Sequence, residues 1–180
     1  LGQIQASGKG DFTADVYVLP LEMQALVGEL VYEGTNYLSN KNFKGSTTLQ
    51  VDMGNMKFSF AEGEFGLNDF LFGLEGFIAM PTDDIEFDLT FAGKDNTFKS
   101  ILSLVPGMYT ERFADLKTSG TMDFNGKFKG IYNDASFPSF DIALLVKDGM
   151  FQYPDLPRPV SDVNVDLRVK NETNNLDNTS

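Results

Sequence analysis

The chain has 180 residues, enough for one domain, and it contains no His, no Cys and no Trp. It therefore lacks the side chains that most often act as general bases, nucleophiles and zinc ligands at neutral pH. The formal net charge of −12, from 26 acidic and 14 basic residues, argues against nucleic-acid binding, because phosphate contacts need clustered Lys and Arg. We expect no enzyme, no cofactor or metal site and no nucleic-acid partner.

Apolar and polar residues alternate through much of the first half of the chain. The alternation covers residues 47–53, 56–60 and 85–91, and the last run reads Ile85-Glu86-Phe87-Asp88-Leu89-Thr90-Phe91. Successive side chains of a strand point to opposite faces, so each run predicts a strand with one apolar and one polar face. Such strands are typical of an antiparallel sheet that is covered on one side only. Gly54-Asn55 predicts a tight turn between the first two runs.

The alternation stops near residue 96. Phe98, Ile101, Leu102 and Val105 recur at helical spacing, with Asp95 or Asn96 as the expected N-cap and Pro106-Gly107 as the stop. A second short turn of helix is predicted over residues 110–116. We expect this insertion to lay its apolar stripe over one end of the sheet.

Alternation returns in the second half, at residues 142–146 and 163–169. Asn125-Gly126 and Asp148-Gly149 predict tight turns, because Gly and Asn tolerate positive φ. Residues 153–159 contain three prolines, which cannot donate hydrogen bonds within a central strand. We therefore expect this segment to be an extended connection into a strand at residues 162–170.

Together these elements predict a mainly β fold. We expect an elongated, curved antiparallel sheet, forming a β-groove or an open barrel or sandwich, with one or two short helices near residues 97–116. Residues 7–12 and 119–124 share four of six residues, which predicts weakly related repeat units over about 1–95 and 118–170 around a helical insertion at 96–116. We expect residues 1–180 to be a single β-rich fragment of a larger protein.

Carboxylates are the only plentiful groups with catalytic chemistry. Four lie close together in the sequence: Asp83, Asp84, Glu86 and Asp88. Paired carboxylates can hydrolyse glycosides, but the alternation puts the last two on the polar side of a strand and the first two in the turn before it. We interpret them as a solvated surface. Residues 123–126 and 171–175 each carry part of a calcium-loop pattern, and neither has its full spacing.

The apolar sides of the strands are the remaining candidate for function. Only one convincing helix is available to cover them, so either a second sheet closes over them or the sheet curls and leaves a furrow. Burying apolar surface stabilises by roughly 25 cal/mol per Å², and an open furrow would attract lipid tails or another apolar partner. The candidates for lining it are Phe58, Phe60, Phe87, Leu89, Phe91, Phe124, Phe128, Leu144, Val146, Val165 and Leu167.

Several segments resemble the AsmA family, and most closely the large AsmA-like proteins of Bacteroidetes-type Gram-negative bacteria. They are residues 98–106, 116–120 and 124–126, and above all the run Gly149-Met150-Phe151-Gln152-Tyr153-Pro154-Asp155-Leu156-Pro157-Arg158-Pro159-Val160. The resemblance covers about residues 85–180 well and the first half only loosely. It brings no catalytic residues with it, and the family's anchoring helix is not among these residues.

The resemblance implies a non-enzymatic section of a periplasmic protein that is anchored to the inner membrane through a segment outside these residues. It further implies a role in outer-membrane biogenesis and phospholipid transport, with phospholipid or another acyl-chain lipid bound along the apolar β-groove. The alternative is a structural or adhesion-type β-domain of the cell envelope, with a closed core and no lipid site.

Overall fold

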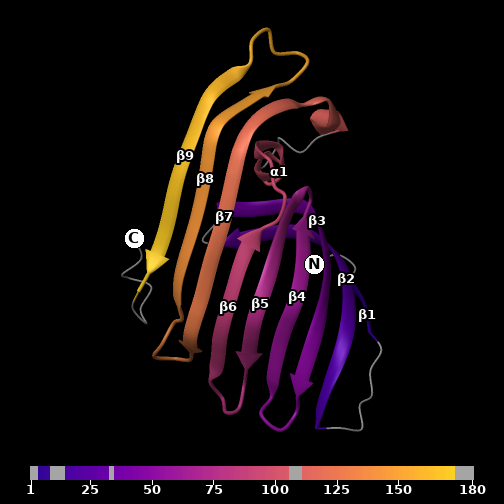
Figure 1. The fold of residues 1–180 in the computed structure, drawn as a ribbon, viewed down its shortest axis with the longest axis vertical. Coiled ribbons are helices and arrows are strands. Elements are labelled where there is room, and N and C mark those ends of the chain that lie inside the picture. Colours follow the sequence, from indigo (N-terminus) through magenta and orange to yellow (C-terminus); the bar gives the residue numbers. More distant parts are fainter. Residues whose placement is uncertain (1–3, 9–14, 33–34, 106–110, 173–180) are drawn as a thin grey trace.

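The computed structural model describes residues 4–8, 15–32, 35–105 and 111–172 (Figure 1). Within them, nine strands form one sheet in which each strand pairs antiparallel with the next along the chain. The strands are β1 (Ile4–Gly8), β2 (Val16–Tyr32), β3 (Thr35–Asp52), β4 (Lys57–Leu67), β5 (Phe70–Ala79), β6 (Ile85–Gly93), β7 (Lys117–Tyr132), β8 (Ser139–Gln152) and β9 (Val160–Asn171). The helix α1 (Phe98–Leu102) and the 3₁₀ helix η1 (Glu111–Asp115) lie between β6 and β7.

The predicted fold class is confirmed, because 72% of the described residues are in strands and the sheet is antiparallel and curved. The turn at Gly54-Asn55 joins β3 to β4, and residues 153–159 connect β8 to β9 as predicted. The helical insertion is also present, although it is less regular than its spacing suggested. The proposed similarity of residues 1–95 to 118–170 stays a prediction, and part of its signal, residues 9–12, lies outside the described residues.

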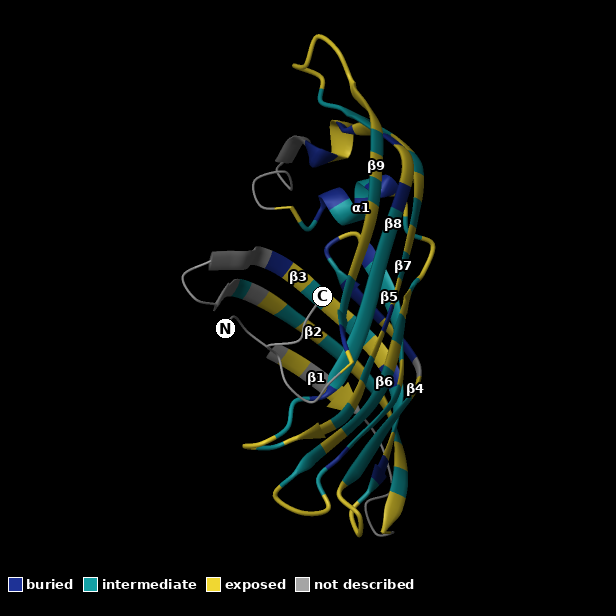
Figure 2. Cartoon of the chain, turned by 90° about the vertical axis from the view of Figure 1, so that its left-hand side faces the viewer, coloured by how far each residue is buried: buried dark blue, intermediate teal, exposed yellow. Residues whose placement is uncertain are grey.

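The sheet curves toward the side on which α1 lies (Figure 2). Its pairing slips at several points in the strand interiors: at residues 46–48 and 60–63 for β3 and β4, and at 119–121 and 146–149 for β7 and β8. An extra residue in one strand of a pair bends that strand and increases its twist. The register shifts therefore account for part of the bending of the long strands.

Two predicted turns are wrong. Asn125-Gly126 lies inside β7, where the Phe91 ring of β6 occupies the space that a Cβ on Gly126 would need, with Cε2 only 2.3 Å from that position. Asp148-Gly149 lies inside β8 at a register shift, with Asp148 at φ 51°. Gly126 leaves room for the neighbouring Phe91 ring, and Asp148-Gly149 forms a bulge. Residues that are typical of turns therefore occur inside these two strands.

The predicted N-cap of the helix is also wrong. Thr97 is the N-cap of α1, and its backbone N–H donates to Ser100 Oγ at 3.2 Å. Asn96 is not available as a cap, because its side-chain amide accepts a hydrogen bond from the N–H of Leu71 and donates one to the Leu71 carbonyl. The regular helix ends at Leu102, and tighter 3₁₀-type hydrogen bonds continue to Val105.

Candidate functional site

The cross-strand pairs bring the eleven residues predicted to line a groove onto one face of the sheet. Directly paired residues of neighbouring strands project to the same side, so rows can be followed across the strands. One row contains Leu49, Phe60, Gly76, Leu89, Phe128 and Phe140, and the next contains Val51, Phe58, Ile78, Phe87 and Gly130. Further rows contain Phe91, Gly126 and Ile142, then Phe124, Leu144 and Leu167, then Met122, Val146 and Val165. We call this side the inner face.

The inner face is almost free of charge. Among its paired residues with described side chains, Lys41 is the only charged one. The charged residues of the same strands lie on the opposite, outer face, where Asp88 pairs with Lys129 and Asp141 with Arg168. Since the chain is strongly acidic as a whole, this segregation leaves an extended apolar surface on one side of the sheet.

One part of the inner face, the covered region, lies beneath the helical insertion. Phe98 and Leu102 of α1, together with Phe113 of η1 and Leu116, form a buried cluster with Val146 of β8, which is only 2% exposed. The inner-face residues that pack against this cluster are Met122, Leu144, Val163 and Val165. Three predicted groove residues, Leu144, Val146 and Val165, therefore contribute to an ordinary hydrophobic core.

The remaining rows form the open region, which we define as Phe58, Phe60, Leu74, Ile78, Phe87, Leu89, Phe91, Phe128 and Ile142. These side chains are half-buried, although they are large and apolar. None of them belongs to the cluster that packs under the helical insertion, and in Figure 2 strands β1 to β3 turn toward the same side of the sheet as α1, below it. Six of the predicted groove residues belong to this region, Phe124 lies at its boundary with the covered region, and Leu167 is 49% exposed on the edge strand β9.

Aromatic rings pack against one another on the inner face. The Phe65 ring lies over Gly45, and the Phe91 ring lies over Gly126, each within 3 Å of the position that a Cβ would take. Stacked, tilted or edge-on contacts then link six rings across five strands: Phe43, Phe65, Phe72, Phe70, Phe124 and Phe91. Because Gly45 and Gly126 have no side chain, they leave room for these two rings against the backbone of the neighbouring strand.

A polar cluster anchors the helical insertion to β3 and to the turn between β4 and β5. The Ser103 carbonyl, just after α1, accepts hydrogen bonds from Lys41 Nζ at 3.0 Å and from Asn68 Nδ2 at 2.9 Å. The Asn68 side chain also accepts a hydrogen bond from the Asn42 N–H at 2.9 Å. Lys41 is 2% exposed, and this burial lowers the pKa of its ammonium group.

This cluster was not predicted from the sequence. Lys41 and Asn68 lie in polar stretches that are typical of solvated turns, and their partner Ser103 is distant in the chain. The only local signal is Asn68 in the turn between β4 and β5, where its φ of 52° suits Asn better than most residues.

The acidic group considered for hydrolysis is spread over the outer face and a turn. Glu86 is exposed on β6, and Asp88 forms an ion pair with Lys129 Nζ at 2.6 Å. Asp83 and Asp84 precede the strand, where Asp84 Oδ1 accepts a hydrogen bond from Asn133 Nδ2 at 3.1 Å. The position of two carboxylates on the outer face and of the other two in the turn agrees with the interpretation as a solvated surface. Over the described residues, no group of three or more acidic side chains is arranged to hold a metal ion.

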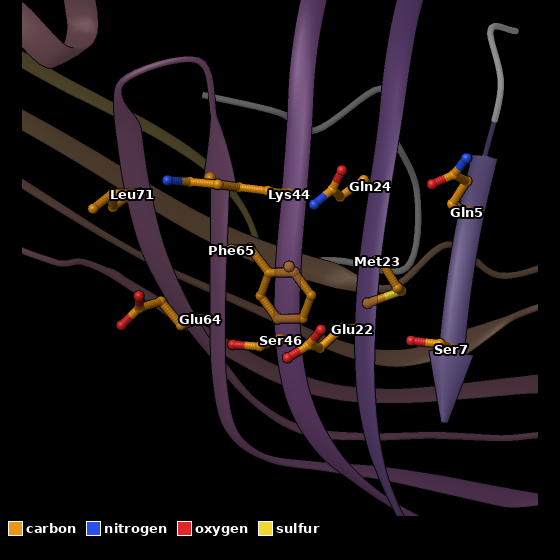
Figure 3. A pocket seen from close by; sticks show the side chains of 12 residues that line it. Gln5, Ser7, Glu22, Met23, Gln24, Lys44, Ser46, Glu64, Phe65 and Leu71 are labelled. Atoms are coloured by element: carbon orange, nitrogen blue, oxygen red, sulfur yellow. The ribbon is translucent and has the colours of Figure 1, made fainter. Parts of the chain in front are cut away.

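A shallow cavity of about 600 Å³ lies over β1 to β5 (Figure 3). By register, most of its polar lining residues belong to the outer face, including Gln24, Lys44 and Glu64. Two lysine side chains, Lys44 and Lys94, come within about 3 Å of the Cβ positions of Gly66 and Gly73. The cavity is open and its polar side chains are exposed, so it is a weaker candidate than the inner face.

Among the described residues, neither helix could serve as a membrane span. Comparison with known proteins adds no relative: no family model, no curated protein and no solved structure matches the chain.

Proposed function

We propose that this protein binds the acyl chains of a lipid on the open region of its inner face, without catalysing a reaction. The single observation that carries the proposal is the half-burial of several Phe, Leu and Ile side chains in adjacent rows of one sheet. Apolar surface of this kind is costly in water, and large exposed apolar patches usually mark binding sites.

The chemistry of the surface favours an acyl chain over a polar ligand. The open region contains no charged residue, and its aromatic rings offer contacts to a chain without directional hydrogen bonds. An extended apolar strip on a curved sheet suits a flexible chain that follows the strands. Together with the resemblance to AsmA-like proteins, this supports a role as a periplasmic section of an envelope protein that handles phospholipid.

The alternative is a structural or adhesion-type domain whose apolar surfaces are all core. The covered region fits that alternative, because Val146 and Leu102 are buried there. The open region separates the two hypotheses. A structural domain predicts that purified protein carries no lipid and that open-region residues matter only for stability.

The test compares a phenylalanine on the inner face of β4 with a phenylalanine on the outer face of β5. Phe60→Gln changes the open region, whereas Phe77→Gln changes the outer face, where the Lys57 ammonium lies 3.7 Å from the centre of the Phe77 ring. Lipid that copurifies is extracted and identified by mass spectrometry, and affinity for a fluorescent fatty acid is measured for both variants. We expect bound lipid in the wild type and weaker binding in Phe60→Gln alone. Absence of lipid, with no fatty-acid binding by any variant, would refute the proposal.

A further inference from the structure

We infer that the open region binds a single-chain lipid in one direction, with the methyl end of the chain at the helical insertion and an uncharged or zwitterionic headgroup at the opposite end. This inference rests on the proposed function. It follows from a difference between the two ends of the inner face, one closed by packed side chains and the other bordered by acidic turns.

The helical insertion closes one end. Phe98 and Leu102 are buried against the sheet, and the Asn96 side chain lies over Gly93 of β6, with Nδ2 only 2.9 Å from the position of a Cβ. Gly93 lies two residues after Phe91 on the same face. Asn96 therefore lies next to the row of the open region that contains Phe91, on the side of the insertion. The hydrogen bonds of Lys41 and Asn68 to the Ser103 carbonyl hold the segment from its other side. The end of an acyl chain that lies along the strands therefore contacts the insertion.

The opposite end of the inner face is bordered by what we call the turn rim: Asp15 and the turns at residues 52–57, 80–84 and 133–138. Hydrogen bonds join these segments into one border, from Met53 N–H to the Asp15 carbonyl, from Met80 N–H to the Met56 carbonyl and from Asn133 Nδ2 to Asp84. In Figure 1 these turns lie at the far end of the strands from α1. From Ile85 to Phe91 the strand covers about 20 Å at 3.3 Å per residue, which is on the scale of one extended acyl chain.

The turn rim is acidic. Its carboxylates are Asp15, Asp52, Asp83, Asp84 and Asp134, and the only cation among its described residues is Lys57. The Lys57 ammonium already contacts the outer-face ring of Phe77. An anionic headgroup at this border would meet like charges, whereas a zwitterionic or neutral headgroup would not.

The reversed orientation would place an anionic headgroup near Lys41, the one charged residue among the paired inner-face residues whose side chains the structure describes. That ammonium group is 2% exposed and donates a hydrogen bond to the Ser103 carbonyl. Reaching it would require a lipid to displace the insertion and to break a buried hydrogen bond, which is unfavourable. The closed end is therefore suited to the methyl terminus.

The experiment uses the native chain and lysophosphatidylcholine that carries a nitroxide either at the methyl end of its chain or on its headgroup. Backbone amide signals are recorded by NMR. The methyl-end label should abolish signals of Asn96, Thr97 and Phe98, and the headgroup label should abolish those of Asn55 and Asp83. Lysophosphatidylglycerol with the same chain should bind more weakly at low salt, and added salt should reduce the difference because it screens exposed charges.

The outcomes separate the inference from the proposed function. Unlabelled lipid that shifts no signal of the open region contradicts both. Binding to the open region with the two label patterns exchanged, or with identical patterns, overturns the inference and leaves acyl-chain binding intact. Equal affinity for the anionic lipid at low salt overturns the assignment of the headgroup.

Discussion

The covered region and the open region of the inner face arise from the same alternating pattern of apolar and polar residues. They differ in whether the helical insertion packs against them. In the covered region Val146 is 2% exposed and packs against Phe98 and Leu102, whereas Phe87 and Leu89 in the open region remain half-buried. Alternation decides only which side of a sheet a residue takes. An insertion that is distant in sequence decides whether that side becomes core or an accessible surface. We therefore expect stability to depend mainly on the first region and binding on the second.

The largest difference should appear when a phenylalanine is truncated in each region. Phe98→Ala removes a buried ring from the covered region, and we expect the free energy of unfolding to fall by about 4 kcal/mol. Phe60→Ala, in the open region, should cost clearly less, because its ring is already partly in water. Urea denaturation of both variants measures the two losses. Equal losses would mean that the open region is as much a core as the covered one.

A second test concerns the backbone of the open region. Gly76 has φ 119°, and a Cβ there would lie 1.9 Å from the Asp88 carbonyl oxygen. We expect Gly76→Ala to lower the free energy of unfolding by about 3 kcal/mol, from backbone strain together with this clash. Gly28→Ala in β2 is the matched control, since nothing lies within 4 Å of its Cβ position. Similar thermal unfolding of the two variants would contradict the close approach of β5 and β6.

The sequence predicted the inner face well and its division poorly. Alternation in Ile85–Phe91 and Val163–Val169 correctly placed those residues, because the period of a strand is a local property. The packing of Val165 against the buried cluster that contains Phe98 depends on contacts between segments far apart in the chain. Gly126 was assigned to a turn because the sequence does not show that Phe91 lies over it. Patterns report local geometry, whereas coverage depends on the tertiary structure.

A third prediction concerns the attachment of the insertion. Asn68→Gly keeps a residue that tolerates φ 52° but removes the hydrogen bonds to Ser103 and from Asn42. We expect a loss of about 2 kcal/mol in unfolding free energy and faster hydrogen exchange at Ser103 and Leu104. Asn68→Ala should lose more, because positive φ also strains alanine. If hydrogen exchange at Ser103 and Leu104 is unchanged in Asn68→Gly, the polar cluster does not anchor the insertion.

The smallest effect should come from the outer face. The Arg168 guanidinium, through a hydrogen bond and its charge, lowers the pKa of Asp141 below its ordinary value of 3.8. A carboxyl whose pKa is lower in the folded state contributes stability above its unfolded pKa and loses it as the pH falls through the folded value. Below about pH 4, wild type should therefore lose stability more steeply than Asp141→Asn. The ion pair is exposed, so high salt should reduce the difference in stability loss between the two proteins. Parallel acid-unfolding curves for wild type and Asp141→Asn would contradict this prediction.

Methyl NMR during a titration with lysophosphatidylcholine tests the division of the inner face most directly. The methyl signals of Ile78, Leu89 and Ile142, in the open region, should shift as lipid is added. Those of Leu102, Leu116 and Val146, in the buried cluster, and of Ala79 on the outer face should stay in place. Uniform shifts across both regions, or no shift in the open region, would contradict the assignment of this surface to acyl-chain binding.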